Sequence, residues 1–330
     1  MSGIAVLGAG AWGTALAASL ARTGHRVHLW GRDEGVVREI ASGRTNGHYL
    51  PGIELPNGIL PTTKLHNAVN GADAVLSVVP VAATNDVLRA IASALSPSVP
   101  VIMCAKGIAP GTGEASEPLL PTAIARAALG DHRNTGSLSG PSFASDVARG
   151  LPTAVTVAMP TQAEAVRVAG LLSSPSLRCY PTDDLRGVEL GGALKNVVAI
   201  GAGIARGRQL GASAHAALVT RGHAEMVRVA MAAGARADTL SGLSGLGDLL
   251  LTASSEQSRN FAHGFALGRG AEPASATVEG VRTSATAATL VRERGLRAPI
   301  VEALDAILHR GADIDRTIAA LLERPVPSEE

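Results

Sequence analysis

The sequence predicts an α/β fold: an amino-terminal Rossmann-type domain with a mainly parallel sheet, followed by an all-α carboxyl-terminal domain. In the first half, short apolar segments alternate with helical segments, a pattern typical of parallel strands covered by helices on both faces. A glycine-rich turn follows the first apolar segment, as in folds that bind nucleotides. After about residue 184, no strand-like alternation is convincing.

Each element follows from this alternation. Strands are predicted at residues 4–7, 26–30, 74–79, 100–105, 136–139 and 154–158, and helices at 11–22, 34–42, 81–95, 116–129 and 162–172. Residues 43–61 are rich in proline and glycine and are predicted to form a long loop near the sheet edge. We divide the chain into a dinucleotide-binding domain at 1–184 and a helical substrate-binding and catalytic domain at 185–330. An apolar segment at 185–205 opens the second domain, and its helices are predicted at 213–232, 246–253, 259–267, 284–294 and 300–308.

Composition excludes several classes of protein. The 330 residues are enough for about two domains. Lysine and arginine total 29 and aspartate and glutamate 28, which gives a net charge of +1 and no electrostatic case for a nucleic-acid partner. Aromatic residues make up 2%, too few for a platform that stacks bases. With 46% hydrophobic and 17% charged residues, the chain is not mainly disordered.

The cysteines and the amino terminus carry no signal for a metal site or export. Cys104 and Cys179 permit at most one disulfide and lack zinc-ligand spacing, so we expect no metal. The first residues lack the features of a secretory signal. No apolar segment reaches about 18 residues without charges, so we expect no integral membrane segment and a cytoplasmic protein.

Gly8, Gly10 and Gly13 form a G-x-G-x-x-G motif. The motif alone is weak, because a chain with 38 glycines gives about half a match by chance. Its position after an apolar strand and at the start of a helix favours dinucleotide binding, with the pyrophosphate at the helix amino terminus. The alternative is a glycine-rich turn that only packs the strand on the helix.

The end of the second strand bears on which dinucleotide binds. An NAD site usually has an acidic residue there, whereas this chain has Gly31, followed by Arg32, which can pair with a 2′-phosphate. Asp33 can cap the next helix or reach the ribose. We therefore expect NADP(H) to be preferred, with NAD(H) possible. The alternative for Arg32 is an ordinary solvated charge.

Lys195 is the candidate proton-transfer group. It lies in an apolar helical segment, where Gly191, Gly192 and Ala199 are its helical neighbours and are predicted to leave a slot for a ligand. Partial desolvation lowers the pKa of a lysine, which suits proton transfer near neutral pH. Asp248 would keep Lys195 charged, while Arg259 and apolar walls would oppose this. The alternative is a lysine that extends from a helix edge into solvent.

Polar residues at four other places complete the candidate site. Lys106 and the segment from Gly140 to Ser142 follow predicted strands, where residues face the ligand crevice of a parallel sheet. An ordinary helix cap is an equally good explanation of Ser142. Asp248 and Thr252 share one face of an apolar helix and therefore need partners. Downstream, the adjacent Ser258, Arg259 and Asn260 can cap a helix and bind an anion.

Over nearly its whole length, the chain resembles the bacterial NAD(P)-dependent glycerol-3-phosphate dehydrogenases. The most specific segments are Gly-Gly-Ala-Leu-Lys-Asn at 191–196, Gly-Leu-Gly-Asp at 245–248 and Ser-Arg-Asn at 258–260. The resemblance implies interconversion of sn-glycerol 3-phosphate and dihydroxyacetone phosphate for glycerophospholipid synthesis. It also implies a homodimer.

The resemblance also implies roles for individual residues. Lys195 would accept the proton in oxidation and donate it in reduction. The substrate would contact Lys106, Gly140, Ser142, Lys195, Asp248, Ser258, Arg259 and Asn260, with the last two nearest its phosphate. The dinucleotide would contact Gly8, Gly10, Ala11, Trp12, Gly13, Arg32, Lys106, Ala144, Arg259, Thr277 and Glu279. The sequence departs from the family pattern at Ala11, at Thr277, and at Phe261 and Ala262.

Two other functions remain open from the residues alone. A 3-hydroxyacid or sugar-acid dehydrogenase of similar architecture would also place a lysine on the first helix of the second domain. The combination of Asp248 with Ser258, Arg259 and Asn260 argues against it. A non-catalytic NADPH-binding sensor would have no need for Lys195 in an apolar helix.

Overall fold

The computed structural model describes residues 2–111, 119–273 and 278–323. Within these residues the strands are β1 (Gly3–Leu7), β2 (Arg26–Trp30), β3 (Ile59–Thr62), β4 (Ala74–Ser77), β5 (Val101–Met103), β6 (Thr135–Ser139), β7 (Thr153–Ala158) and β8 (Leu177–Thr182). The helices among and beside them are α1 (Ala11–Arg22), α2 (Glu34–Gly43), α3 (Leu65–Val69), α4 (Val81–Ile91), α5 (Pro121–Leu129), α6 (Ala144–Arg149) and α7 (Gln162–Leu172).

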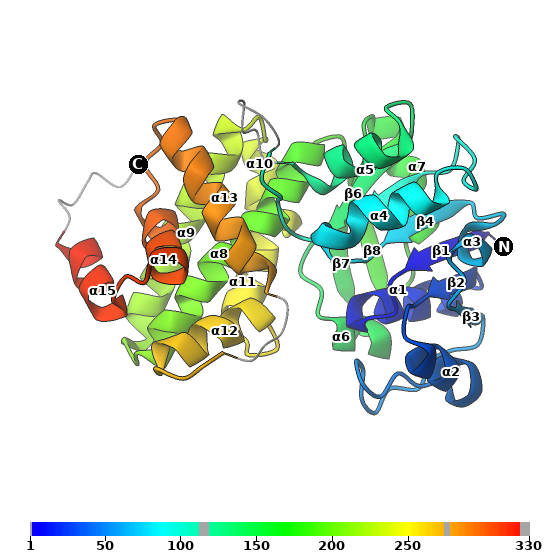
Figure 1. The fold of residues 1–330 in the computed structure, drawn as a ribbon, viewed down its shortest axis with the longest axis horizontal. Helices are drawn as coiled ribbons and strands as arrows, with labels where there is room; N and C mark the ends of the chain where they lie inside the picture. The colour runs from blue at the N-terminus through cyan, green and yellow to red at the C-terminus, as the bar shows by residue number, and fades with distance from the viewer. Residues whose placement is uncertain (1, 112–118, 274–277, 324–330) are drawn as a thin grey trace.

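The second half of the described chain is helical. Its elements are α8 (Leu185–Gly207), α9 (Gly211–Ala232), α10 (Ala237–Ser241), the π-helix η1 (Leu243–Gly247), α11 (Asp248–Ala253), α12 (Arg259–Gly268), α13 (Glu279–Glu293), α14 (Pro299–Arg310) and α15 (Ile314–Leu322). Figure 1 shows these helices gathered on one side of the molecule and the sheet with its covering helices on the other. The predicted fold class is therefore confirmed.

The described strands form one eight-stranded sheet in the order β3-β2-β1-β4-β5-β6-β7-β8. All neighbouring strands are parallel except β6 and β7, which are antiparallel. The chain order reverses between β1 and β4, and ligands of open α/β sheets bind beyond the carboxyl ends of strands at such a point. The strands form because their residues are apolar: Ile4, Leu29 and Leu76 have no solvent exposure.

Helix α8 is the core of the helical half. It packs on α9, α11, α12 and α13, and Figure 1 shows it running among them. Within the described ranges it alone is long and apolar enough to cross a membrane, but the whole of its apolar window is buried inside the protein. This burial is typical of the central helix of a folded domain.

Glycines bring the backbones of α8 and α12 into contact. A Cβ atom added to Gly264 would lie 2.0 Å from the carbonyl oxygen of Ile200, and one added to Gly203 would lie 2.2 Å from that of Phe261. No larger residue fits at either position without moving a backbone. This close packing fixes the start of α12, and with it Arg259, relative to the helix that carries Lys195.

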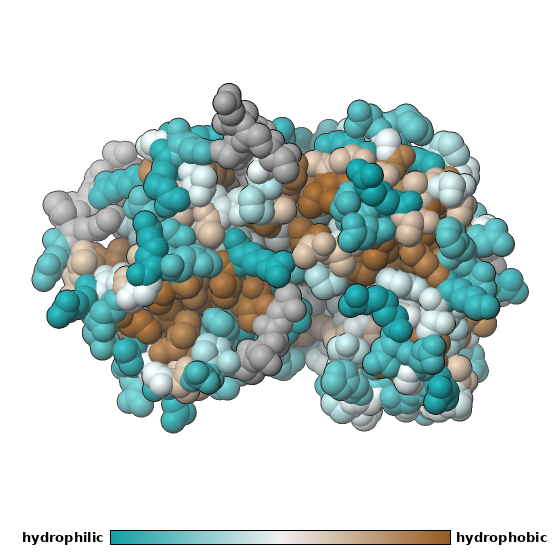
Figure 2. Space-filling model, in the orientation of Figure 1, coloured by the Kyte–Doolittle hydropathy of each residue, from teal (hydrophilic) through white to brown (hydrophobic). Residues whose placement is uncertain are grey.

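The surface of the protein carries both apolar and hydrophilic residues. Figure 2 shows apolar areas on both halves of the visible face, each bordered by hydrophilic residues. Single large apolar side chains are exposed in both halves, for example Leu151 and Leu250. Scattered exposure of this kind is ordinary in folded proteins.

Two strands were not predicted. The expected loop at 43–61 ends in β3, an edge strand that contains Pro61, and the strand β8 contains Arg178 and Pro181. Both strands form an edge of the sheet and are only partly buried, so their residues lack the continuous apolar pattern of the central strands.

Several helix boundaries also differ from the prediction. Residues 116–118 of the helix expected at 116–129 lie outside the described residues, and α5 begins at Pro121. The helix expected at 246–253 is preceded by η1, and the helix expected at 284–294 already begins at Glu279. Four short helices, α3, α6, α10 and α15, had no predicted counterpart. Proline at the first helical turn favours a helix start, which explains α5.

Candidate functional site

A pocket of about 900 Å³ lies beyond the carboxyl ends of β1, β2, β4 and β5. Its walls come from both halves of the chain, so it is a cleft between the sheet and the helical bundle. Most of the predicted site residues line it: Gly8, Gly10, Ala11, Trp12, Gly13, Arg32, Lys106, Ser142, Ala144, Lys195, Asp248, Ser258, Arg259, Asn260 and Glu279.

The glycine turn is shaped to receive an anionic group. Gly8 has a φ of 125°, and a Cβ atom on Gly13 would lie 1.8 Å from the carbonyl oxygen of Gly8, so neither position accepts a side chain. Gly10 opens onto the pocket, with no atom near its Cβ position. Within the described residues, no side chain caps α1. The first N–H groups of α1 are therefore available to a pyrophosphate, and the chain fits a dinucleotide here.

The end of β2 settles what Asp33 does in this structure. Its Oδ1 accepts a hydrogen bond of 3.0 Å from the backbone N–H of Val36, so Asp33 caps α2. A Cβ atom on Gly31 would lie 2.8 Å from the Cβ of Ala9, which leaves no room for an acidic side chain at that position. Arg32 is exposed and lines the pocket. Arg32 and Asp33 therefore both face this end of the pocket, and one oxygen of Asp33 is already used in capping α2.

Lys195 is a buried ammonium group with defined partners. Only 6% of the residue is exposed. Its Nζ donates to Asp248 Oδ1 at 2.9 Å and to the hydroxyl of Thr252. Burial lowers the pKa of Lys195 to about 8, although the charge of Asp248 opposes the shift. The positive charge of Lys106 also lowers the pKa of Lys195. The sequence alone predicts this effect from Arg259 instead.

Asp248 lies between two lysines from the two halves of the chain. Its Oδ2 accepts from Lys106 Nζ at 2.6 Å, and its Oδ1 from Lys195. Burial raises the pKa of Asp248, but the charges and hydrogen bonds of the two lysines outweigh this effect and hold the pKa below its usual range. Lys106 also donates to the carbonyl oxygen of Gly140 at 3.0 Å. The carboxylate thus fixes both ammonium groups in the pocket.

A chain of amides extends from Lys106 to α13. Asn196 donates to the carbonyl oxygen of Lys106 at 3.2 Å, and Asn260 donates to Asn196 Oδ1 at 2.9 Å. The backbone N–H of Gly280 in turn donates to Asn260 Oδ1. These contacts orient both asparagines, so that Asn260 is held at a fixed point of the pocket wall.

Three further predicted residues lie at the start of α12 and α13. Ser258 caps α12 by accepting from the N–H of Phe261 at 3.3 Å. Arg259 is exposed and lines the pocket, so its guanidinium is accessible to an anion. Burial raises the pKa of Glu279, and the charges of Arg282 and Arg259 oppose that shift. Arg259 and Glu279 are therefore close enough to interact.

One local prediction was wrong, and one alternative is excluded. The glycines before Lys195 do not leave a slot for a ligand: a Cβ atom on Gly191 would lie 2.9 Å from the carbonyl oxygen of Ser244, and one on Gly192 2.6 Å from Ser139 Oγ. These glycines let α8 pack closely on η1 and β6. Of the two explanations left open for Ser142, the helix cap does not hold, because α6 begins after Phe143 and Ser142 Oγ donates to the carbonyl oxygen of Gly140.

Other residues differ from the predicted set. Gly140 does not line the pocket, although its carbonyl oxygen accepts from Lys106, which does, and Thr277 lies outside the described residues. Tyr49, Asn196 and Gln257 also line the pocket but were not among the candidates. The sequence predicts a buried hydroxyl at Thr252 that needs a partner, and the structure supplies Lys195 Nζ as that partner. The sequence around Tyr49 gives no sign that this residue lines a pocket. Asn196 could have been predicted, because it directly follows Lys195.

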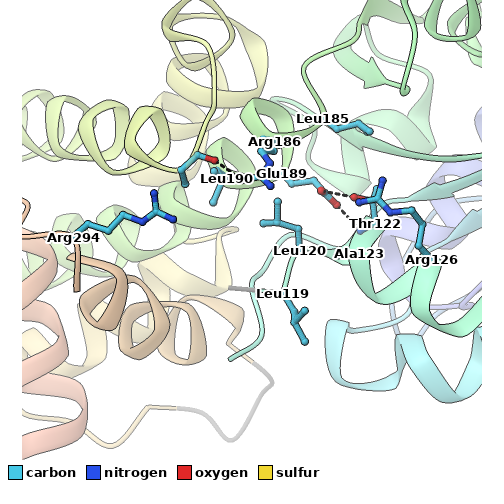
Figure 3. A pocket seen from close by; sticks show the side chains of 11 residues that line it. Leu119, Leu120, Thr122, Ala123, Arg126, Leu185, Arg186, Glu189, Leu190 and Arg294 are labelled. Carbon is cyan, nitrogen blue, oxygen red and sulfur yellow. Dashed lines mark hydrogen bonds between the residues drawn. The ribbon is translucent and has the colours of Figure 1, made fainter. Parts of the chain in front are cut away.

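A smaller pocket of about 260 Å³ lies between α5 and α8, away from the glycine turn. Its wall includes Glu189, which accepts from the N–H of Thr122 at 2.8 Å and from its hydroxyl at 2.7 Å. Figure 3 shows this contact, with Arg126 beside it. Burial raises the pKa of Glu189 to about 7. The contact ties α8 to the amino terminus of α5 and so holds the two halves together.

The amino-terminal sequence model of the NAD-dependent glycerol-3-phosphate dehydrogenases matches residues 3–165, and the carboxyl-terminal one residues 184–319. The glycerol-3-phosphate dehydrogenase [NAD(P)+] of Chelativorans sp. (strain BNC1) is 53% identical over 99% of this chain and 98% of its own. That of Brucella canis is 52% identical over 99% of both chains. The crystal structure of glycerol-3-phosphate dehydrogenase from Coxiella burnetii is 35% identical and covers 98% of this chain and 99% of its own, with a TM-score of 0.90. The chain therefore belongs to the NAD-dependent glycerol-3-phosphate dehydrogenase family.

Proposed function

We propose that this chain interconverts sn-glycerol 3-phosphate and dihydroxyacetone phosphate with a nicotinamide dinucleotide. The observation that carries the proposal is the buried Lys195–Asp248 pair, which opens onto the pocket that also contains the glycine turn. Family membership supports this activity over a hydroxyacid or sugar-acid dehydrogenase and over a non-catalytic sensor. A reduced nicotinamide dinucleotide held at the glycine turn would supply the hydride.

Lys195 supplies the proton in this proposal. Because burial lowers its pKa to about 8, the ammonium form is present at neutral pH and releases its proton readily to a forming alkoxide. Asp248 and Thr252 hold the Nζ atom in place. In the opposite direction, the neutral amine accepts the proton of the substrate hydroxyl.

Arg259 and Asn260 form the phosphate end of the substrate site in this proposal. The side chain of Arg259 offers several N–H donors to the pocket, and Asn260 is held beside it by Asn196. The proposed substrate contacts are Lys106, Gly140, Ser142, Lys195, Asp248, Ser258, Arg259 and Asn260. The proposed dinucleotide contacts are Gly8, Gly10, Ala11, Trp12, Gly13, Arg32, Lys106, Ala144, Arg259, Thr277 and Glu279, to which the pocket lining adds Tyr49.

We propose that NADP(H) is preferred to NAD(H). The capping bond to Val36 orients Asp33 toward α2 and uses its Oδ1, which weakens the case for Asp33 as the acceptor of a ribose 2′-hydroxyl. Close packing of Gly31 on Ala9 excludes an acidic side chain at the neighbouring position. Arg32 then provides a cation for a 2′-phosphate.

The family resemblance supports three further proposals. The chain works as a cytoplasmic homodimer, its glycerol 3-phosphate supplies glycerophospholipid synthesis, and the dinucleotide-binding and helical domains divide between Asp184 and Leu185. The last proposal agrees with the start of α8 at Leu185, where Asp184 caps the helix by accepting from the N–H of Gly187 at 2.9 Å.

Replacing Lys195 tests the catalytic assignment. Lys195→Met retains the length and the apolar contacts of the side chain but has no proton to donate. We expect turnover of dihydroxyacetone phosphate with NADPH to fall by about 10²- to 10⁴-fold, the usual contribution of a general acid. The measurement is the loss of NADPH absorbance, with circular dichroism as the check that the variant is folded. Near-normal turnover in a folded variant would disprove the assignment.

Replacing Arg259 tests phosphate recognition. In Arg259→Ala, the KM for dihydroxyacetone phosphate should rise by about tenfold to a hundredfold, because a charged hydrogen bond to the phosphate is lost. Arg269→Ala is the matched control, since Arg269 is an exposed arginine at the other end of α12 and does not line the pocket. Equal effects of the two substitutions, or equal activity of the wild type on glycerol and its phosphate, would contradict the proposal.

Replacing Arg32 tests the choice of dinucleotide. Arg32→Ala should raise the KM for NADPH about tenfold and change the KM for NADH little, because only NADPH carries the 2′-phosphate. Arg38→Ala, an exposed arginine of α2 away from the pocket, provides the control. If Arg32→Ala weakens NADPH and NADH alike, Arg32 does not select the phosphate.

A further inference from the structure

Asn46 is a fully buried polar residue in the segment between α2 and β3. Its Nδ2 donates to the carbonyl oxygen of Ala9 at 3.0 Å and to the hydroxyl of Thr14 at 2.8 Å. Both partners belong to the glycine turn and the first turns of α1. A buried amide is costly unless it is hydrogen-bonded, so this side chain is tied to the turn.

We propose that Asn46 is a positioning residue for the dinucleotide: it fixes the glycine turn in the form that receives the pyrophosphate. The inference rests on the proposed function of this pocket. It concerns a residue that does not line the pocket, and it acts through Ala9 and Thr14 rather than by contact with the nucleotide.

The hydrogen bonds determine which way the amide of Asn46 faces. A carbonyl oxygen only accepts, so the atom facing Ala9 must be the Nδ2 donor. The hydroxyl of Thr14 accepts from Asn46 and points back at the same carbonyl oxygen of Ala9, at 3.4 Å. Within the described residues, Asn46 Oδ1 has no partner. The polar contacts of the side chain are thus directed at the glycine turn and the residue that braces it.

Anchoring the Ala9 carbonyl also orients the next N–H group. The peptide unit is planar and trans, so its C=O and N–H groups point in opposite directions. Holding the oxygen of Ala9 on Asn46 therefore fixes the direction of the N–H of Gly10. Gly10 lines the pocket at the start of α1, where N–H groups bind anions. A glycine turn is otherwise conformationally free, so this constraint preorganises it.

The backbone of Asn46 holds a second wall of the same pocket. Its carbonyl oxygen accepts from the N–H of Leu50 at 2.7 Å and from that of Tyr49 at 3.2 Å. Leu50 is buried against Ala15 of α1, and Tyr49 lines the pocket. One residue thus couples the glycine turn to the segment that places Tyr49.

The test measures NADPH affinity in Asn46→Leu and Asn46→Asp. Both remove the donor to Ala9, and the aspartate also places an acceptor against that carbonyl oxygen. We expect the KM for NADPH, and its Kd from quenching of tryptophan fluorescence, to rise about tenfold or more. The KM for dihydroxyacetone phosphate and the turnover at saturating NADPH should change less than about threefold. Asn134→Leu is the matched control, because Asn134 directly precedes β6 and so lies at the amino ends of the parallel strands, whereas the pocket lies beyond their carboxyl ends.

Thr14 provides a second route to the same result if Asn46 variants do not fold. Thr14→Val should raise the KM for NADPH in the same direction, and Thr14→Ser, which keeps the hydroxyl, should restore it. The double variant Asn46→Leu/Thr14→Val should lose less NADPH binding free energy than the two single variants lose together, because both substitutions act on the carbonyl of Ala9.

The outcomes separate this inference from the proposed function. Folded Asn46 and Thr14 variants with normal NADPH affinity would overturn the inference while leaving the function intact. Equal losses of NADPH and dihydroxyacetone phosphate affinity would also overturn it, since they would indicate a purely structural role. A wild-type protein that binds neither NADPH nor NADH would instead overturn the proposed function.

Discussion

The site depends on one carboxylate, Asp248, which is buried between two ammonium groups. Lys106 reaches it from the strand half of the molecule and Lys195 from the helical half. An unpaired charge at that depth would be very costly, so the three groups stabilise one another only in this arrangement. The pair of salt bridges therefore joins the two halves of the chain at the pocket and sets the position of the proton-transfer group at the same time.

The packing around this triad explains why the two halves can meet so closely. Helix α8 is lined with glycine where it touches η1, β6 and α12, so backbones approach each other without intervening side chains. The contact of Glu189 with Thr122 ties the same helix to α5. Lys195 thus lies on an element fixed from several sides, while Gly8 to Gly13 and Asn46 fix the opposite wall. In a preorganised site of this kind, little conformational entropy is lost when a ligand binds.

The sequence predicts most of this fold because the central strands are continuously apolar and the glycine turn lies at the expected point. It also identifies Asp248 as a polar group in need of partners. It cannot identify those partners, because Lys106 is 142 residues away in the chain. The ligand slot predicted at Gly191 and Gly192 is wrong, because the sequence does not distinguish a glycine that makes room for a ligand from one that makes room for another backbone. Edge strands such as β3 are not predicted, because a proline and partial burial weaken the apolar sequence pattern by which strands are identified.

The most direct test of the account is the titration of Lys195 itself. The chain has only three lysines, so labelling them with ¹³C and ¹⁵N gives a simple NMR spectrum in which the signal lost in Lys195→Met identifies that residue. The account predicts that the Lys195 amine titrates with a pKa of about 8 in the folded protein, because burial disfavours its charge. A pKa at or above 10 would show that the charge of Asp248 outweighs the effect of burial, and it would contradict the proposal that Lys195 is tuned for proton transfer near neutral pH.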